Sequence, residues 1–148
     1  MSAPSDARAA GFDALVRLIA RSGGVQYSTV LAFEADGGGL AGRRVFTTVP
    51  DIYPTGRSKP LPASEWLDHV HHRAALFVAD GEAAIRAAYP DPETVFGLGA
   101  VRLANKPVMV GGQCVALLNV AQGPGHDWDA LAATLDDAAA VVAALLAQ

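Results

Sequence analysis

The chain has 148 residues, which suits one domain of ordinary size, and 51% of them are hydrophobic against 18% charged. The net charge is −4 and no cluster of Lys and Arg stands out, which argues against nucleic acid or anionic membrane as partners. The single cysteine, Cys114, excludes an internal disulfide and a cysteine-based zinc site. With no signal-like start and no apolar run long enough to span a bilayer, we expect one cytoplasmic domain over residues 1–148.

The first third of the chain predicts a helix followed by a β-hairpin. Apolar residues recur at helical spacing from Asp6 to Arg21, and Gly23-Gly24 then supplies a helix end. Residues Val25 to Phe33 alternate with period two and are rich in β-branched and aromatic types, which is typical of a strand. The chain turns at Asp36–Gly39, and a second strand is expected over Arg43–Val49.

The middle of the chain predicts short elements punctuated by proline. No regular element is expected in the loop from Pro50 to Pro62. Four short elements are then expected: a helix capped by Ser64 that reaches His72, a strand over Ala75–Ala79, a helix capped by Asp80 that ends before Pro90, and a two-turn helix from Asp91.

The last third predicts two strands, Ala100–Val110 and Gln113–Ala121, joined by a glycine pair, and then one long helix over Asp127–Ala147. Pro107 implies a bulge or an interruption in the first of these strands, because proline cannot donate a hydrogen bond to the sheet. Because successive strands form hairpins, the fold class is α+β with an antiparallel sheet.

Several short segments resemble the GAF domain family, and together they span most of the chain. They are Tyr53-Pro-Thr-Gly56-Arg-Ser-Lys59-Pro60, Trp66, Leu98-Gly99, Asn105-Lys-Pro107-Val108, and the hairpin from Gly111 to Asn119. The resemblance is to stand-alone bacterial members. It implies a central antiparallel sheet of five to six strands, with N- and C-terminal helices on one face and a pocket formed by short helices and loops on the other. It also implies a small-molecule ligand and a homodimer through the terminal helices.

Three functions known in that family lack their residues here. A bilin is attached through a cysteine, but Cys114 lies in an expected strand. The sulfoxide reductase relatives need more than one cysteine, and the Asn-Lys-Phe-Asp-Glu signature of cyclic-nucleotide members is absent. The ligand and any cofactor therefore stay unidentified.

The expected pocket lies between the loop that contains Tyr53 and the helices around Trp66. Arg57 and Lys59 would favour an anionic ligand there, unless both are solvated loop charges. Trp66 offers a face to a planar ligand or else packs in the core. The candidate ligand-binding residues are Tyr53, Arg57, Lys59, Trp66, His69, His72, Tyr89, Phe96 and Asn105.

Other reactive side chains have plainer interpretations. His69, His71 and His72 suggest a metal site, but zinc needs three or four ligands and only His126 remains, so no metal is expected. Cys114 has no neighbouring base and is expected to be buried. Asn105 and Asn119 could each fix a bulge or present an amide to a ligand.

The leading hypothesis is therefore a small-molecule-binding sensor domain. One alternative is a dimerisation or protein-interaction module without a ligand, suggested by the apolar stripe on the last helix. The other is an enzyme with His69 or His72 as general base, although no constellation of nucleophile, base and oxyanion donors is found.

Overall fold

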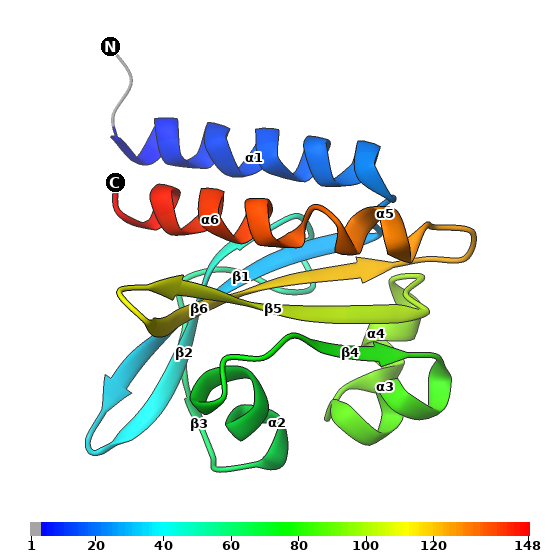
Figure 1. The fold of residues 1–148 in the computed structure, drawn as a ribbon. Helices are drawn as coiled ribbons and strands as arrows, with labels where there is room; N and C mark the ends of the chain where they lie inside the picture. The colour runs from blue at the N-terminus through cyan, green and yellow to red at the C-terminus, as the bar shows by residue number, and fades with distance from the viewer. Residues whose placement is uncertain (1–3) are drawn as a thin grey trace.

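The structure, a computed structural model, describes residues 4–148 as a six-stranded antiparallel sheet with helices on both faces (Figure 1). The strands are β1 (Tyr27–Asp36), β2 (Gly39–Thr47), β3 (Ser58–Leu61), β4 (Phe77–Asp80), β5 (Arg102–Val110) and β6 (Gln113–Gln122), in the order β3-β2-β1-β6-β5-β4. The helices are α1 (Pro4–Ser22), α2 (Glu65–Leu67), η1 (Asp68–His72, a π-helix), α3 (Glu82–Ala88), α4 (Pro92–Gly97), α5 (Trp128–Ala132) and α6 (Leu135–Leu146). All paired strands are antiparallel, which confirms the expected α+β class. Among the residues described, no helix combines the length and apolar character that crossing a membrane requires.

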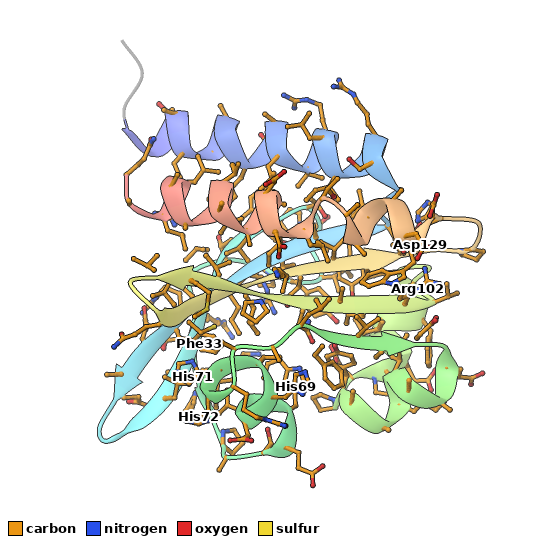
Figure 2. The ribbon with its side chains drawn as sticks, viewed as in Figure 1. Phe33, His69, His71, His72, Arg102 and Asp129 are labelled. Carbon is orange, nitrogen blue, oxygen red and sulfur yellow. The ribbon has the colours of Figure 1, made fainter. Side chains whose placement is uncertain are left out.

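The short elements α2, η1, α3 and α4 lie on one face of the sheet, and side chains fill the space between (Figure 2). Alternate strand residues point to this face because successive side chains of a strand point to opposite sides. They include both polar and apolar types: Tyr27, Thr29, Leu103, Asn105, Leu117 and Asn119. We call this the pocket face.

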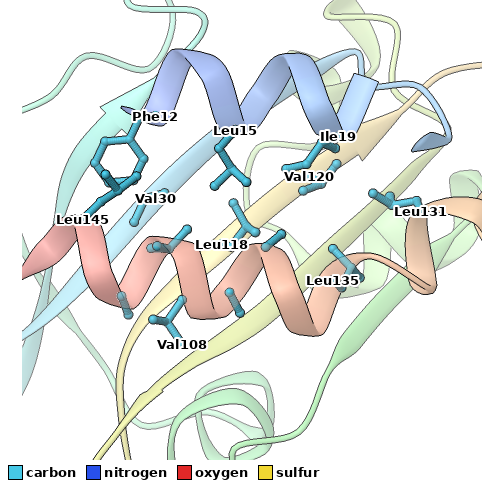
Figure 3. Packing of buried hydrophobic residues seen from close by; sticks show 14 residues of the cluster. Phe12, Leu15, Ile19, Val30, Val108, Leu118, Val120, Leu131, Leu135 and Leu145 are labelled. Atoms are coloured by element: carbon cyan, nitrogen blue, oxygen red, sulfur yellow. The ribbon is translucent and has the colours of Figure 1, made fainter. Parts of the chain in front are cut away.

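The terminal helices α1 and α6 run side by side over the other face, which we call the helix face (Figure 1). Its core is apolar and is formed by the inner faces of the helices and the intervening strand residues (Figure 3). The buried members include Phe12, Leu15, Ile19, Val30, Val108, Leu118, Val120, Leu131, Leu135, Val142 and Leu145. The apolar stripe of the last helix is thus accounted for within the chain's own core.

A bulge in β2 separates the directions of two nearby side chains. Val30 pairs with Phe46 but Leu31 pairs with Arg44, so Val45 is an extra residue on β2. In a regular strand Arg44 and Phe46 would point the same way. Here Phe46 stacks on Phe12 of α1 at a centroid distance of 4.9 Å, whereas Arg44 lines a cavity on the pocket face.

A second bulge lies near Pro107, as expected, although the extra residue is on the partner strand. Val108 pairs with Ala116 and Met109 with Cys114, which leaves Val115 unpaired. Strand β5 itself continues past Pro107 without interruption. Cys114 is buried toward the pocket face against Val70, and burial raises the pKa of its thiol. The expectation that Cys114 is a buried residue is confirmed.

The prediction of one long C-terminal helix is wrong. It breaks into α5 and α6 at Ala133–Thr134, where the Thr134 hydroxyl donates to the Leu131 carbonyl at 2.8 Å. Such bonding of a threonine side chain to the preceding turn competes with the regular helix hydrogen bonds. The apolar spacing continues through the break, so the pattern alone does not reveal it.

The prediction that Pro50 to Pro62 contains no regular element is also wrong for the end of this segment. Residues Ser58–Leu61 form strand β3 at the edge of the sheet. A proline is tolerated there because an edge strand leaves one row of backbone groups unpaired. Of the two expected caps, one serves another partner. Gly81 rather than Asp80 precedes α3, and Asp80 pairs with Arg102 at 3.3 Å. Ser64 does cap α2, and its hydroxyl accepts from the Leu67 amide.

Candidate ligand site

A small cavity of about 140 Å³ lies on the pocket face between the central strands, the loop that joins β2 to β3, helix α2, and the segment that precedes α4. We call it the inner cavity. Its lining combines aromatic, charged and amide side chains with two aliphatic ones: Tyr27, Thr29, Arg44, Tyr53, Trp66, Tyr89, Asp91, Val95, Leu103, Asn105 and Asn119. An enclosed apolar cavity of about 150 Å³ can hold benzene, so this space suits a ligand of about six non-hydrogen atoms.

Asn105 is the centre of a hydrogen-bond network on the cavity wall. Its Oδ1 accepts from Trp66 Nε1 at 2.9 Å and from the Tyr89 hydroxyl at 2.5 Å. Its Nδ2 donates to Asn119 Oδ1 at 2.7 Å, and Asn119 Nδ2 donates to Thr29 Oγ1 at 3.1 Å. Because Asn105 and Asn119 pair directly across β5 and β6, strand register holds the two amides together. The network therefore ties α2 and the end of α3 to three strands.

Arg44, Tyr53 and Asp91 form the charged side of the cavity. The Arg44 guanidinium lies over the Tyr53 ring, 4.8 Å from its centroid, and Arg44 Nη1 donates to the Pro54 carbonyl at 3.2 Å. The Tyr53 hydroxyl donates to Asp91 Oδ2 at 2.6 Å. Tyr53 thus contacts both charged groups, with its ring toward the cation and its hydroxyl toward the anion.

The tyrosines of this site are held neutral by their surroundings. Burial, with a further contribution from the Asp91 charge, raises the pKa of Tyr27 to about 12. Burial also raises the pKa of Tyr53 and of Tyr89, and burial lowers the pKa of Arg44. At neutral pH the phenols are hydrogen-bond donors, and they present no negative charge to a ligand.

A larger and mostly apolar groove of about 950 Å³ lies beside the inner cavity. We call it the outer groove. It is lined by residues of α2, η1, β4 and α3 together with the chain before α2: Leu61, Pro62, Ser64, Glu65, Trp66, His69, Arg73, Phe77, Ala84, Ala87, Ala88, Tyr89 and Pro90. Trp66 and Tyr89 line both spaces, so these two rings and their shared acceptor Asn105 form the partition between them.

The structure brings together some of the residues singled out from the sequence. Tyr53, Trp66, Tyr89 and Asn105 line the inner cavity, and His69 lines the outer groove with Trp66 and Tyr89. The remaining candidates line neither space. Arg57 and Lys59 are exposed at the sheet edge, His72 is exposed, and Phe96 lies under Arg86 at 4.9 Å.

Of the three neighbouring histidines, His69 lies apart, whereas the rings of His71 and His72 meet edge-on at a centroid distance of 5.0 Å (Figure 2). His69 Nε2 is 2.9 Å from the Leu76 carbonyl oxygen, and its ring meets the Phe77 ring edge-on. His71 lies against Phe33 at 4.5 Å, and burial lowers its pKa. His72 Nδ1 is 3.7 Å from Asp68. Over residues 4–148, no group of three or more His, Cys, Asp or Glu side chains could hold a metal ion.

Sequence reasoning missed four lining residues that matter chemically: Tyr27, Thr29, Arg44 and Asp91. Tyr27 and Thr29 are two residues apart in the expected first strand, so their side chains point to the same face of the sheet. Their hydroxyl groups distinguish this face from a purely apolar one. The sequence predicts Asp91 as the start of a helix, but its side chain makes no cap hydrogen bond. Nothing in the sequence indicates that Arg44 faces the cavity, because the bulge at Val45 decides which face of the sheet its side chain points to.

No protein-family model matches this sequence, and no curated protein is detectably similar to it. Solved structures do resemble it. A GAF domain/HD domain protein from Geobacter sulfurreducens has a TM-score of 0.68 at 13% identity, covering 93% of this chain and 90% of that one. The GAF domain of a two-component sensor histidine kinase from Bacillus halodurans has a TM-score of 0.65 at 12% identity, covering 93% and 91%. The NreA protein from Staphylococcus aureus, studied as a variant in its nitrate binding site, has a TM-score of 0.52 at 11% identity, covering 78% and 84%. The chain therefore has the fold of a GAF domain.

Proposed function

We propose that the chain is a single sensor domain of GAF type that binds a small molecule in the inner cavity. The observation that carries the proposal is the polar wall of that cavity. Asn105 is buried and serves two donors from the short helices while its own amide reaches Asn119. Buried polar groups destabilise a fold unless they are hydrogen-bonded, and an apolar filling would be simpler for a core.

The comparisons support this proposal at the level of fold. The Bacillus halodurans domain is part of a sensor kinase, and the Staphylococcus aureus protein has a site for nitrate, a small polar ligand. We extend small-ligand binding to this chain because its inner cavity has the size of a small ligand and is lined by polar donors. The ligand-free alternative loses its main support, since α6 buries Leu135 and Val142 in the chain's own core.

The test is a search for a bound ligand with a filled cavity as control. Native mass spectrometry of the purified protein should show a retained small mass. The variant Val95→Phe, which adds a ring to a buried lining residue, should lose it. Val101→Phe is the matched control, because Val101 is partly exposed and lines neither space. A retained mass that survives Val95→Phe in a folded protein would place the ligand elsewhere and contradict the proposal.

We also propose that the domain is cytoplasmic and forms a homodimer through the outer sides of α1 and α6. Leu18 on α1 and Val141 on α6 are exposed, at 55% and 42%. Because neither supports the core, Leu18→Gln with Val141→Gln should shift sedimentation from dimer to monomer without loss of folding. Unchanged sedimentation as a dimer would place the interface on another surface.

A further inference from the structure

We propose that the inner cavity recognises a small zwitterion, with a carboxylate bound by Arg44 and an ammonium group bound by Asp91. This inference rests on the proposed function and names the class of ligand that the same site would take. It comes from two opposite charges that line one cavity, and among residues 4–148 neither forms an ion pair with the other or with another charged side chain.

Arg44 lines the inner cavity and has N–H donors to spare. A guanidinium carries five N–H groups, and the hydrogen bond to the Pro54 carbonyl uses one of them. In the described part of the chain no carboxylate lies within 4.0 Å of its nitrogens. The side chain is only partly exposed, and its planar fork is suited to a carboxylate held by two parallel hydrogen bonds.

Asp91 supplies the opposite charge. Its Oδ2 accepts from the Tyr53 hydroxyl, while its Oδ1 has no hydrogen bond to the described residues. The carboxylate does not cap α4, although its backbone stands at the cap position. It therefore keeps acceptor capacity toward the cavity, where an ammonium group could donate to it.

Tyr53 contacts both charges. Its ring lies 4.8 Å from the Arg44 guanidinium and its hydroxyl donates to Asp91 Oδ2 at 2.6 Å, so the same side chain helps to position both groups. A ligand with a single negative charge would satisfy Arg44 but would also feel repulsion from Asp91. A ligand with a single positive charge would be attracted by Asp91 but repelled by Arg44. Only a ligand with both charges complements both residues, which is how charge placement produces specificity.

The size of the cavity narrows the class further. A space of about 140 Å³ suits about six non-hydrogen atoms, the size of alanine or β-alanine. Growth of a ligand toward the outer groove would meet Trp66 and Tyr89, which form the partition and donate to Asn105. We therefore infer a ligand on the scale of the smallest amino acids, with the charge separation set by the positions of Arg44 and Asp91.

The experiment is calorimetric titration of the full chain with glycine, β-alanine and 4-aminobutyrate, which carry the same charges at increasing separation. Propionate and n-propylamine are the single-charge controls. At least one amino acid should bind ten-fold or more tightly than both controls. Propionate binding as tightly as every amino acid would overturn the zwitterion and leave the proposed function intact, because the cavity would then be an anion site.

Two variants assign the charges. Asp91→Asn should weaken the preferred amino acid at least ten-fold while propionate binding is kept or improved. Arg44→Met should abolish binding of both the preferred amino acid and propionate. If Arg44→Met does not fold, Arg44→Lys takes its place in the experiment. Arg57→Gln, an exposed arginine outside the cavity, is the control. Amino-acid binding unchanged by Asp91→Asn would overturn the assignment.

The two proposals fail in distinguishable ways. If none of the five probes binds but native mass spectrometry shows a retained mass that Val95→Phe removes, the zwitterion is wrong and the ligand site stands. If no probe binds and no mass is retained, both proposals fail.

Discussion

The two faces of the sheet bury different kinds of side chain. On the helix face, side chains from α1, α5 and α6 meet aliphatic strand residues in an apolar core. On the pocket face, aromatic rings surround hydrogen-bonded amides and leave a cavity of about 140 Å³. The same strands serve both faces, because their side chains alternate.

The difference separates what holds the fold together from what could recognise a ligand. Apolar burial is non-directional and scales with area, so the helix face needs only shape and hydrophobicity. Polar burial is directional, and each donor on the pocket face needs a placed acceptor. Substitutions on the two faces should therefore differ in size, in chemistry and in their dependence on pH.

The largest effect on stability should come from the helix face. Leu131 is fully buried between α5 and the sheet, and Leu131→Ala should lower the free energy of unfolding by about 2–5 kcal/mol. Urea unfolding followed by circular dichroism measures it. A loss comparable to that of an exposed residue such as Val101→Ala would show that this core does not dominate stability.

The next effect should come from the network on the pocket face. Asn105→Leu removes the acceptor of Trp66 and Tyr89, and an unsatisfied buried group costs about 1–3 kcal/mol. We expect a loss of about 2–3 kcal/mol in urea unfolding. Adding Trp66→Phe and Tyr89→Phe removes the stranded donors and should recover part of the loss. Three simply additive losses would contradict the network.

The pocket face should also be the source of a loss of stability in alkali. The folded pKa of Tyr27 is about 12 against an ordinary value of 10.0, so the unfolded chain releases this proton first. Stability is then fully present below about pH 10 and is lost as pH rises toward 12, by roughly 1 kcal/mol per pH unit. Unfolding at pH 9 to 11.5 should show a shallower decline for Tyr27→Phe. Identical slopes for the variant and the natural chain would exclude Tyr27 as a contributor.

The smallest effect is expected at the sheet edge, outside both faces. Arg57→Gln with Lys59→Gln changes two exposed charges that line neither space. The unfolding midpoint should not change measurably, and affinity for any ligand found should stay within two-fold. A larger loss of affinity would mean that β3 folds over the ligand and that the site extends to the edge.

Sequence patterns predicted much of the scaffold because their causes are local. The alternation in Val25–Phe33 and the glycines at the turns gave the hairpins, and hairpins imply an antiparallel sheet. The resemblance to the GAF family gave the layers. The break at Thr134 and the short strand β3 were missed, because a side-chain hydrogen bond and edge pairing decide them.

The candidate site was predictable only in part. Tyr53, Trp66 and Asn105 came from the segments that carry the family resemblance, and Tyr89 came from the helices expected around the pocket. The structure places all four around the inner cavity. Arg57 and Lys59 are the cations that the sequence suggests, because both lie inside a segment that carries the resemblance. Which charge faces a cavity depends on strand pairing, and β3 carries Lys59 along the outer edge of the sheet.

The sequence by itself determined most of the helices and strands and the antiparallel hairpins, since each follows from residues close together in the chain. The tertiary structure alone decided which charges meet. Arg44 reaches the cavity because Val45 bulges out of register with β1, and Asp91 reaches it because Tyr53, 38 residues earlier, holds its carboxylate. Both depend on contacts between distant segments, which no local pattern records.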